Sequence, residues 1–143
     1  MRGVAAGGSA VGHPERIPPG LSVLLAEDNL INQKVGEKIL ASLGFRVDLA
    51  GNGAEAVNMA MRKGYDFILM DIHMPVMDGL TATREIRAWE SSQGWERQKI
   101  IALTASVMQN DRDISSHAGM DDFLSKPILV GELTRMLAAN LRR

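Results

Sequence analysis

Apolar and polar positions alternate in blocks from residue 21 to the C-terminal end of the chain. Short runs that are apolar on both faces predict strands buried in a parallel sheet, although the run at residues 45–50 alternates instead. The predicted strands are Leu21–Ala26, Phe45–Ala50, Phe67–Met70, Ile100–Leu103 and Asp122–Ser125. Between and after them, apolar residues recur at helical spacing. The predicted helices are Leu30–Leu43, Ala54–Lys63, Leu80–Trp89, Val107–Ala118 and Val130–Leu141.

The helical patterns also predict which side chains face the core. In the first helix the expected buried stripe is Val35, Ile39 and Leu43, and Gly44 is the stop signal. The third helix is expected to end before a polar loop through Ser91-Ser92-Gln93-Gly94. The inward-facing residues expected in the second helix are Ala56, Val57, Ala60 and Met61.

Strand and helix alternate strictly through five units, which predicts a parallel sheet covered by helices on both faces with right-handed crossovers. The expected fold is a single-domain, flavodoxin-like α/β fold with the doubly wound strand order 2-1-3-4-5. Residues 1–20 are rich in Gly, Ala and Pro and contain few large apolar side chains, so we expect a flexible leader or linker there. Residues 21–143 form the predicted domain.

Composition narrows the functional classes. The net charge of about -1 gives no broad attraction to nucleic acid or to an anionic membrane surface. Cysteine is absent, which excludes disulfides, thiolate catalysis and Cys-based zinc sites, and the three histidines lack metal-ligand spacing. No apolar run approaches the roughly 20 residues of a membrane span. These features predict a cytoplasmic domain without membrane contact of its own, although a larger parent protein could be membrane-anchored.

Charged and hydroxyl side chains follow directly after four of the predicted strands. A charged group at the end of a buried strand is costly unless it is used, and ligands of open parallel sheets bind at that edge. Taken singly, Asp71 could instead cap the following loop, and Glu27 with Asp28 could form a helix N-cap cluster. The set comprises Glu27, Asp28, Asp71, Thr104 and Lys126.

The predicted strand order places the first and third strands side by side, so their three carboxylates converge on one crevice. Their mutual repulsion is severe in a partly desolvated site unless a cation is present. Ligation by oxygen alone suits a hard divalent ion such as Mg²⁺. Lys126 and Thr104 complete a cradle for a second, anionic group, so the pattern favours a site that receives a phosphoryl group on a carboxylate.

Four segments at these strand ends closely resemble the motifs of a response-regulator receiver domain, over about Leu21 to Arg143. They are Leu24–Asn29, Met70–Gly79, Leu103–Ala105 and Phe123–Pro127. Within that family the chain is most similar to receivers attached to hybrid sensor histidine kinases. The segments that carry this closer similarity are Asn29–Gln33 and Ala118–Phe123. The resemblance implies a two-component phosphorelay receiver that accepts a phosphoryl group from phosphohistidine and switches or relays the signal.

The resemblance also implies a role for each acidic residue. Asp71 is expected to be the phosphoacceptor and to attack phosphorus as a carboxylate nucleophile. Asp28 and Asp71 are expected to ligate Mg²⁺, with Mn²⁺ as a second candidate ion. His73 would ligate through its backbone carbonyl and Glu27 through ordered water.

Under the same resemblance, other residues of these motifs would bind the phosphoryl group. Lys126 is expected to pair first with Asp71 and then with the phosphoryl oxygens, while the Thr104 hydroxyl and the Ala105 amide bind the other oxygens. The resemblance also implies a cis peptide bond between Lys126 and Pro127. His73 and Ser106 resemble positions that tune the lifetime of the aspartyl phosphate.

The resemblance also implies an output switch, and the helical pattern indicates a docking contact. Thr104 and Phe123 are expected to form the switch pair, whereas the alternative for Phe123 is a constitutively buried aromatic ring. Leu30 lies about 140° from Val35 on a helical wheel, at roughly 100° per residue, so it is a candidate exposed contact, with Ile31 at the edge of the stripe. The expected partner is a histidine-phosphotransfer domain or a histidine kinase, and the chain itself is expected to be monomeric.

Three other functions compete with this interpretation. A stand-alone response regulator or phosphorelay shuttle would carry the same motifs as a receiver excised from a hybrid kinase. A phosphatase of the haloacid-dehalogenase kind also uses a strand-end aspartate and Mg²⁺, but it needs a second acid two residues later, where this chain has His73. A phosphorylation-independent interaction domain predicts the loss of at least one site residue. As a receiver, the domain would show only slow autodephosphorylation, and protein-histidine kinase activity would belong to the parent protein.

Overall fold

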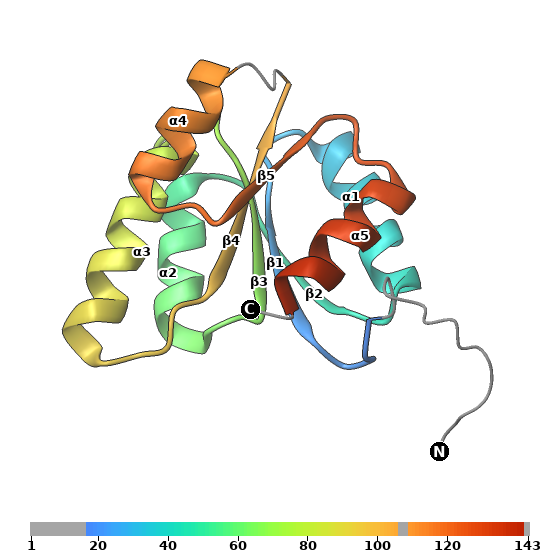
Figure 1. Cartoon of the computed structure of the whole chain (residues 1–143), viewed down its shortest axis with the longest axis horizontal. Helices are drawn as coiled ribbons and strands as arrows, with labels where there is room; N and C mark the ends of the chain where they lie inside the picture. Colours follow the sequence, from blue (N-terminus) through green and yellow to red (C-terminus); the bar gives the residue numbers. More distant parts are fainter. Residues whose placement is uncertain (1–16, 106–108, 142–143) are drawn as a thin grey trace.

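The computed structural model describes residues 17–105 and 109–141, and its five strands form one parallel sheet in the order β2-β1-β3-β4-β5 (Figure 1). The predicted alternation and strand order are therefore confirmed. The strands are β1 (Ser22–Ala26), β2 (Arg46–Ala50), β3 (Phe67–Asp71), β4 (Lys99–Thr104) and β5 (Asp122–Ser125). The helices are α1 (Leu30–Ser42), α2 (Gly53–Lys63), α3 (Gly79–Gln93), α4 (Gln109–Ala118) and α5 (Val130–Leu141). Among these described helices, none is both long and apolar enough to cross a membrane.

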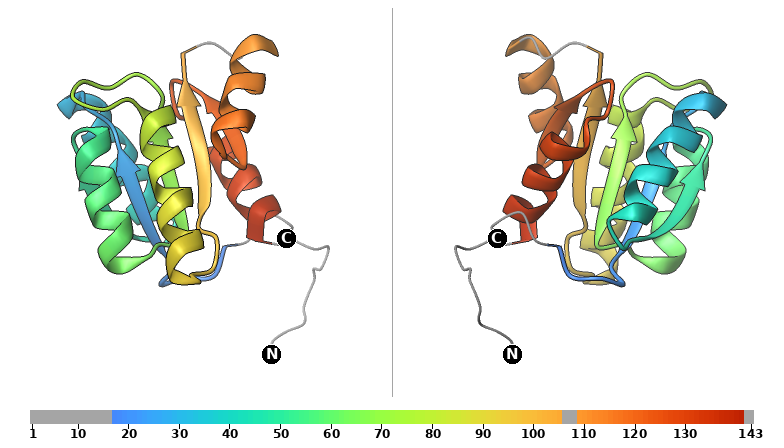
Figure 2. Two further views of the ribbon diagram at one scale, coloured as in Figure 1. Left: turned by 90° about the vertical axis from the view of Figure 1, so that its left-hand side faces the viewer. Right: turned by 90° about the vertical axis from the view of Figure 1, so that its right-hand side faces the viewer.

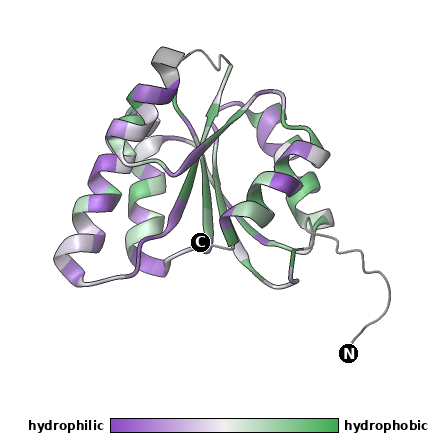
Figure 3. Cartoon of the chain, in the orientation of Figure 1, coloured by the Kyte–Doolittle hydropathy of each residue, from purple (hydrophilic) through white to green (hydrophobic). Residues whose placement is uncertain are grey.

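The sheet lies between two helical layers, with α2, α3 and α4 on one side and α1 and α5 on the other (Figures 1 and 2). Successive strand residues point to opposite faces, so each strand contributes to both hydrophobic clusters. Figure 3 shows the hydrophobic residues concentrated along the central strands. Burial on both faces, as predicted for central strands, is thus confirmed. Examples are Leu24, Ile68 and Ile100 in one cluster and Leu25, Leu69 and Ile101 in the other, each at most 1% exposed.

Three helices begin at the carboxyl edge of the sheet with a capping side chain. Asn29, Asn52 and Asp78 each accept a hydrogen bond from a backbone N–H three residues later, at the starts of α1, α2 and α3. Each cap satisfies an amide that the first helical turn leaves unpaired. The loops at this edge are consequently held in place by the helices that follow them.

The predicted buried stripe of α1 is wrong at Val35, which is 50% exposed, whereas Gly36 and Leu40 are buried. A Cβ atom at position 36 would lie 2.7 Å from Leu25 Cδ2, so the missing side chain lets α1 approach β1 closely. Because glycine carries no hydrophobic signal, the pattern could not reveal that the helix packs through it. Ile39, which was predicted to be buried, is only half-buried.

The third helix is longer than predicted, because α3 includes Ser91, Ser92 and Gln93, which we expected in a polar loop. These residues are exposed, so their polarity reflects the solvent-facing last turn and not the end of the helix. Gly94 ends α3 in the left-handed conformation at φ 68°, and its N–H donates to the carbonyl of Glu90. The predicted start of the fourth helix at Val107, and Ser106 before it, lie outside the described residues.

Candidate functional site

The register of the sheet brings the strand-end acids of β1 and β3 to the same level. Ala26 of β1 pairs with Met70 of β3, so the next residues, Glu27 and Asp71, lie beside each other. Ligand atoms of Glu27, Asp28 and Asp71 all lie within 4.8 Å of one another. Glu27 and Asp71 are 2% and 3% exposed, whereas Asp28 is exposed to solvent. The predicted convergence of three carboxylates is therefore observed.

Lys126 neutralises only part of this charge. Its Nζ lies 2.7 Å from Asp71 Oδ2 and 3.2 Å from Glu27 Oε1. Burial alone would lower the pKa of Lys126, but the hydrogen bonds and Coulomb attraction to Asp71 and Glu27 outweigh it and raise the pKa above its usual 10.5. Lys126 is thus a firmly protonated point charge against the acceptor carboxylate, and its peptide bond to Pro127 is cis, as predicted.

Asp71 is held by the loop that follows it. The backbone N–H of His73 donates to Asp71 Oδ1 at 3.1 Å, while the Oδ2 atom accepts from Lys126. At the end of the loop, the Gly79 N–H donates to the Ile72 carbonyl. A Cβ at position 79 would lie 2.2 Å from the Asp71 carbonyl oxygen, so only glycine fits this close approach. The loop therefore orients Oδ1 of Asp71, and Lys126 orients Oδ2.

Glu27 is oriented by the start of α1. Its Oε2 accepts from the Asn29 N–H at 3.0 Å, and its carbonyl accepts from Gln33 Nε2 at 2.6 Å. The remaining oxygen faces Lys126. We did not predict this direct pairing of Glu27 with Lys126, which joins residues 99 positions apart and follows only from the positions of β1 and β5 in the sheet.

Thr104 is the last residue of β4 and Ala105 follows it, on the opposite side of Asp71 from β1. Thr104 is 4% exposed and aligns with Ser125 of β5, and its carbonyl accepts from the Lys126 N–H at 2.8 Å. Ala105 is exposed at the strand end. The fold thus places both residues at the carboxyl end of β4, the strand that lies between β3 with Asp71 and β5, which leads to Lys126.

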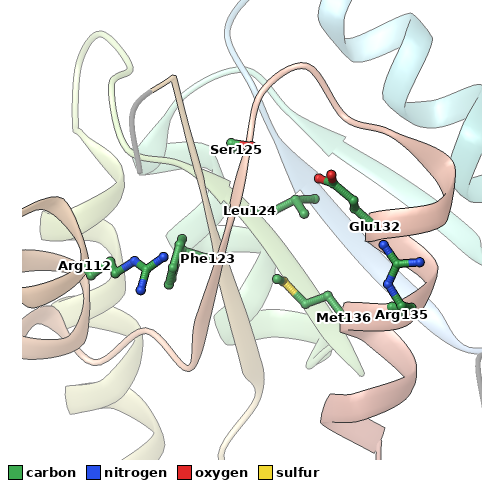
Figure 4. Close-up of a pocket in the computed structure, with 7 residues that line it drawn as sticks. All are labelled: Arg112, Phe123, Leu124, Ser125, Glu132, Arg135 and Met136. Carbon is green, nitrogen blue, oxygen red and sulfur yellow. The ribbon is translucent and has the colours of Figure 1, made fainter. Parts of the chain in front are cut away.

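Phe123 lies on β5, three residues before Lys126, and its ring is half-buried. The Arg112 guanidinium lies 4.4 Å from the ring centroid, in cation–π contact. Figure 4 shows these two side chains at one end of a hollow between α4, β5 and α5, with a volume of about 440 Å³. A half-buried ring beside open space differs from the alternative of a constitutively buried core aromatic.

Leu30 and Ile31, the candidate docking residues, are 70% and 72% exposed at the start of α1. Val35 is exposed one turn later, so α1 carries three exposed apolar side chains. The residues at the crevice and those on this helix therefore occupy the same edge of the sheet.

The donor set fits a hard divalent cation. All side-chain donors are carboxylate oxygens, two of the three carboxylates are buried, and a single ammonium group opposes them. Asp28 forms no hydrogen bond or ion pair with the rest of the described chain, so it is available as a ligand. This arrangement can bind a metal ion beside the Asp71 carboxylate.

Comparisons with known proteins all find receiver domains or the histidine kinases that contain them. The family model described as "Response regulator receiver domain" matches residues 23–138. The hybrid signal transduction histidine kinase K of Dictyostelium discoideum is 40% identical over 117 residues, which cover 79% of this chain and 10% of that protein. The chain therefore spans about a tenth of the length of that relative.

Two solved structures extend the comparison. The receiver domain of a sensor histidine kinase from Pseudomonas aeruginosa, with magnesium coordinated in its active-site cleft, is 49% identical at a TM-score of 0.78, covering 87% of this chain and 99% of that one. The receiver domain of Saccharomyces cerevisiae Ssk1, in complex with the histidine phosphotransfer protein Ypd1, is 34% identical at a TM-score of 0.79, covering 85% and 88%.

Proposed function

This chain belongs to the response regulator receiver domain family, and we propose that it accepts a phosphoryl group from phosphohistidine onto Asp71. The observation that carries the proposal is the geometry at Asp71. One of its oxygens is 2.7 Å from the Lys126 ammonium, and two further carboxylates lie within 4.8 Å. An aspartate held in this way is buried, oriented and only partly neutralised, which suits a nucleophile.

In the proposed reaction a carboxylate oxygen of Asp71 attacks the phosphorus atom. A bond forms from oxygen to phosphorus as the bond from phosphorus to the donor's imidazole nitrogen breaks, and that nitrogen keeps the electron pair. Because the transition state is loose and highly charged, catalysis consists mainly of positioning and charge neutralisation. Lys126 supplies a fixed positive charge beside the receiving oxygen.

We assign the metal site to the acidic cluster. Asp28 and Asp71 would hold Mg²⁺ through their side chains, His73 through its carbonyl, and Glu27 through water. The bound ion would neutralise the carboxylates and the phosphoryl oxygens. The Mg²⁺ in the cleft of the Pseudomonas receiver supports the choice of ion, and Mn²⁺ is a second candidate that satisfies the same oxygen donors.

Residues of β4 and β5 and of the loops after them would bind the transferred phosphoryl group and change conformation in response to it. Thr104 and Ala105 would bind phosphoryl oxygens together with Lys126. Phosphorylation adds roughly -1.5 to -2 charges, so Thr104 would move towards them and Phe123 would shift into the space it leaves. The cation–π contact of Arg112 would have to loosen as the Phe123 ring moves.

The proposed partner is a histidine-phosphotransfer domain or a histidine kinase, as the Ypd1–Ssk1 complex and the kinase relative suggest. We propose that the chain is the C-terminal receiver of a hybrid histidine kinase, with a stand-alone phosphorelay shuttle as the alternative. A phosphatase of the haloacid-dehalogenase kind is disfavoured, because His73 is exposed and stands where that chemistry needs an acid. A monomeric state, a cytoplasmic location and the division into a leader at 1–20 and a domain at 21–143 remain predictions.

A phosphotransfer assay tests the proposal. Ypd1 carrying phosphohistidine is mixed with the wild type, with Asp71→Asn and with Leu30→Asp, each in Mg²⁺ and in EDTA. We expect transfer to the wild type in Mg²⁺ and none to Asp71→Asn, since an amide is a poor nucleophile. Undiminished transfer to Asp71→Asn would contradict the assignment of the acceptor.

Leu30→Asp tests the docking surface separately. This substitution replaces an exposed apolar side chain on α1 with a charge, so transfer from Ypd1 should slow by about tenfold or more. Labelling by acetyl phosphate, which needs no protein docking, should be unchanged. Equal losses with both donors would show that Leu30 acts on the site itself and not on the partner.

A further inference from the structure

Arg112 of α4 and Phe123 of β5 face each other at the edge of the sheet (Figure 4). The guanidinium carbon of Arg112 lies 4.4 Å from the centroid of the Phe123 ring, well inside the range of about 6 Å for a cation–π interaction. Arg112 is exposed, whereas the ring is half-buried and packs against the hydrophobic cluster on the α4 side of the sheet. The contact therefore joins a solvent-facing helical residue to a ring at the border of the core.

The Arg112 guanidinium contacts this ring although carboxylates lie nearby. Arg112 and Phe123 border a second hollow, of about 260 Å³, which Asp121 and Asp122 also line. Asp121 is already paired with two other arginines. Asp122 accepts from the Phe123 N–H and from Asn140. In the part of the chain that the structure describes, Arg112 forms no hydrogen bond or ion pair, so its charge is directed at the ring.

Packing does not lock the Phe123 ring in this position. The ring borders the hollow of about 440 Å³ between α4, β5 and α5 as well as the smaller one. Phe123 aligns with Ala102 of β4, and residues two apart on a strand share a face, so Ala102 and Thr104 lie on the same face as the ring. Because Ala102 is small, β4 places no bulky side chain beside the ring on this face. The cation–π contact is therefore a specific restraint on a ring that has room to move.

A contact that is made in only one of two conformers shifts the equilibrium between them. In the proposed function, phosphorylation of Asp71 draws Thr104 inwards, and the Phe123 ring follows and moves away from Arg112. The cation–π contact thus stabilises the unphosphorylated arrangement alone. Because coupling between two sites is reciprocal, an interaction that holds the ring beside Arg112 also disfavours phosphorylation.

We propose that Arg112 is a brake on the phosphorylation of Asp71, which acts by holding the Phe123 ring in the position seen here. The inference rests on the proposed function and extends it, since it makes a residue of α4 determine how readily the acceptor site is phosphorylated. Arg112 touches no reacting atom, so it is a positioning residue that acts through Phe123. Its removal should make the domain easier to phosphorylate, whereas damage to the site would make phosphorylation harder.

The experiment compares substitutions of Arg112 with a matched control in the full chain. Arg112→Gln keeps a long polar side chain but removes the charge, whereas Arg112→Lys keeps a cation. Arg135→Gln is the control, because Arg135 is an exposed arginine that lines the same hollow from α5, and among the described residues Arg112 alone stacks on Phe123. Two quantities are measured in Mg²⁺, the rate of labelling by acetyl phosphate and the dissociation constant of beryllofluoride, a mimic of the phosphoryl group.

We expect Arg112→Gln to be labelled about three- to fivefold faster than the wild type and to bind beryllofluoride more tightly by the same factor, as the strength of an exposed cation–π contact predicts. Arg112→Lys should lie close to the wild type. Arg135→Gln loses the same charge, which weakens the attraction of an anionic donor, so its labelling should be unchanged or slightly slower.

A double substitution tests whether Arg112 acts through the ring. Phe123→Leu removes the aromatic face, so adding Arg112→Gln to Phe123→Leu should change neither the labelling rate nor the affinity for beryllofluoride. An equal gain from Arg112→Gln in this background would show that the ring does not transmit the effect, and would overturn the inference.

Other outcomes also overturn the inference. Labelling of Arg112→Gln at the wild-type rate or more slowly would show that the contact is not a brake. An equal gain in Arg135→Gln would assign the effect to net charge. Faster labelling without tighter binding of beryllofluoride would exclude a shifted equilibrium. Failure of the wild type itself to be labelled would instead contradict the proposed function.

Discussion

Two clusters of charged residues in this domain differ in how their charge is balanced. The acceptor cluster sets three carboxylates, Glu27, Asp28 and Asp71, against the single ammonium of Lys126. The second cluster, around Arg87, lies near the start of β4 and sets two arginines against two carboxylates. The acceptor cluster keeps a net negative charge that a cation can neutralise, whereas the charges of the Arg87 cluster balance.

The Arg87 cluster is closed. The guanidinium of Arg87 lies 2.8 Å from Glu90 and 2.9 Å from Asp121, and it also donates to the Gly119 and Gln98 carbonyls. Its two carboxylates accept from backbone N–H groups as well. A buried polar network in which every member is satisfied can fix α3 to the segment before β5, but it offers no site for a ligand.

The contrast separates structural acids from chemical ones. Burial alone does not distinguish them, since Glu90 at 4% exposure resembles Asp71 at 3%. The distinguishing feature is the number of cationic side chains that pair with the carboxylates. A group of carboxylates with too few such partners is stable only if a bound cation neutralises the remaining charge. Substitutions that change the charge of either cluster therefore test this difference.

The largest effect is expected from breaking the closed cluster with Arg87→Met. The substitution leaves Glu90 buried without a cation and Asp121 paired with Arg97 alone, which should lower the free energy of unfolding by about 3–5 kcal/mol. Urea unfolding of the variant gives the value. Arg84→Met, an exposed arginine on the same helix, is the control and should change it by less than about 0.5 kcal/mol. Similar losses in the two variants would mean that the Arg87 network does not hold the domain together.

Neutralising one carboxylate should change the melting temperature in opposite directions in the two clusters. Asp28→Asn removes like-charge repulsion, so without Mg²⁺ its melting temperature should rise by a few degrees, while the stabilisation that Mg²⁺ gives the wild type should vanish. Asp121→Asn weakens two ion pairs and should lower the melting temperature with or without Mg²⁺. Thermal melts in Mg²⁺ and in EDTA compare them. Destabilisation by Asp28→Asn in EDTA would show that the acceptor cluster is also closed.

The smallest effect is expected at an exposed pair, Asp48 with Lys63, where solvent screens the charges. Hydrogen bonds from Lys63 and Tyr65 hold the pKa of Asp48 below its usual 3.8. Because the folded-state pKa is the lower one, the pairing stabilises the domain above the usual value and is lost as the pH falls below it. Asp48→Asn should cost less than about 1 kcal/mol at pH 7. Urea unfolding at several pH values should show the difference between wild type and variant disappearing in acid, and a difference that grows there would contradict this assignment.

Much of the fold and the acceptor site could be predicted because both follow from local patterns. An apolar run ending in Asp71 indicates a buried strand and a strand-end acid at once, and the β-α alternation gives the strand order that brings Asp71 beside Glu27. The presence of Thr104 and Lys126 at the neighbouring strand ends follows from the same reasoning.

Features that depend on three-dimensional contacts could not be predicted. The Arg87 network joins α3 to a segment more than thirty residues later, and no local pattern marks it. The face of α1 was misassigned because its closest approach to the sheet occurs through Gly36.

The most direct test of the central claim is to locate the phosphoryl group by peptide mass spectrometry after incubation with acetyl phosphate. We predict one phosphoryl group on the peptide containing Asp71, present in Mg²⁺, absent in EDTA and absent from Asp71→Asn. The Arg87→Met variant, assayed below its melting temperature, should still be labelled, because the closed cluster takes no part in the chemistry. A phosphoryl group at another residue, or equal labelling in Mg²⁺ and EDTA, would contradict the account.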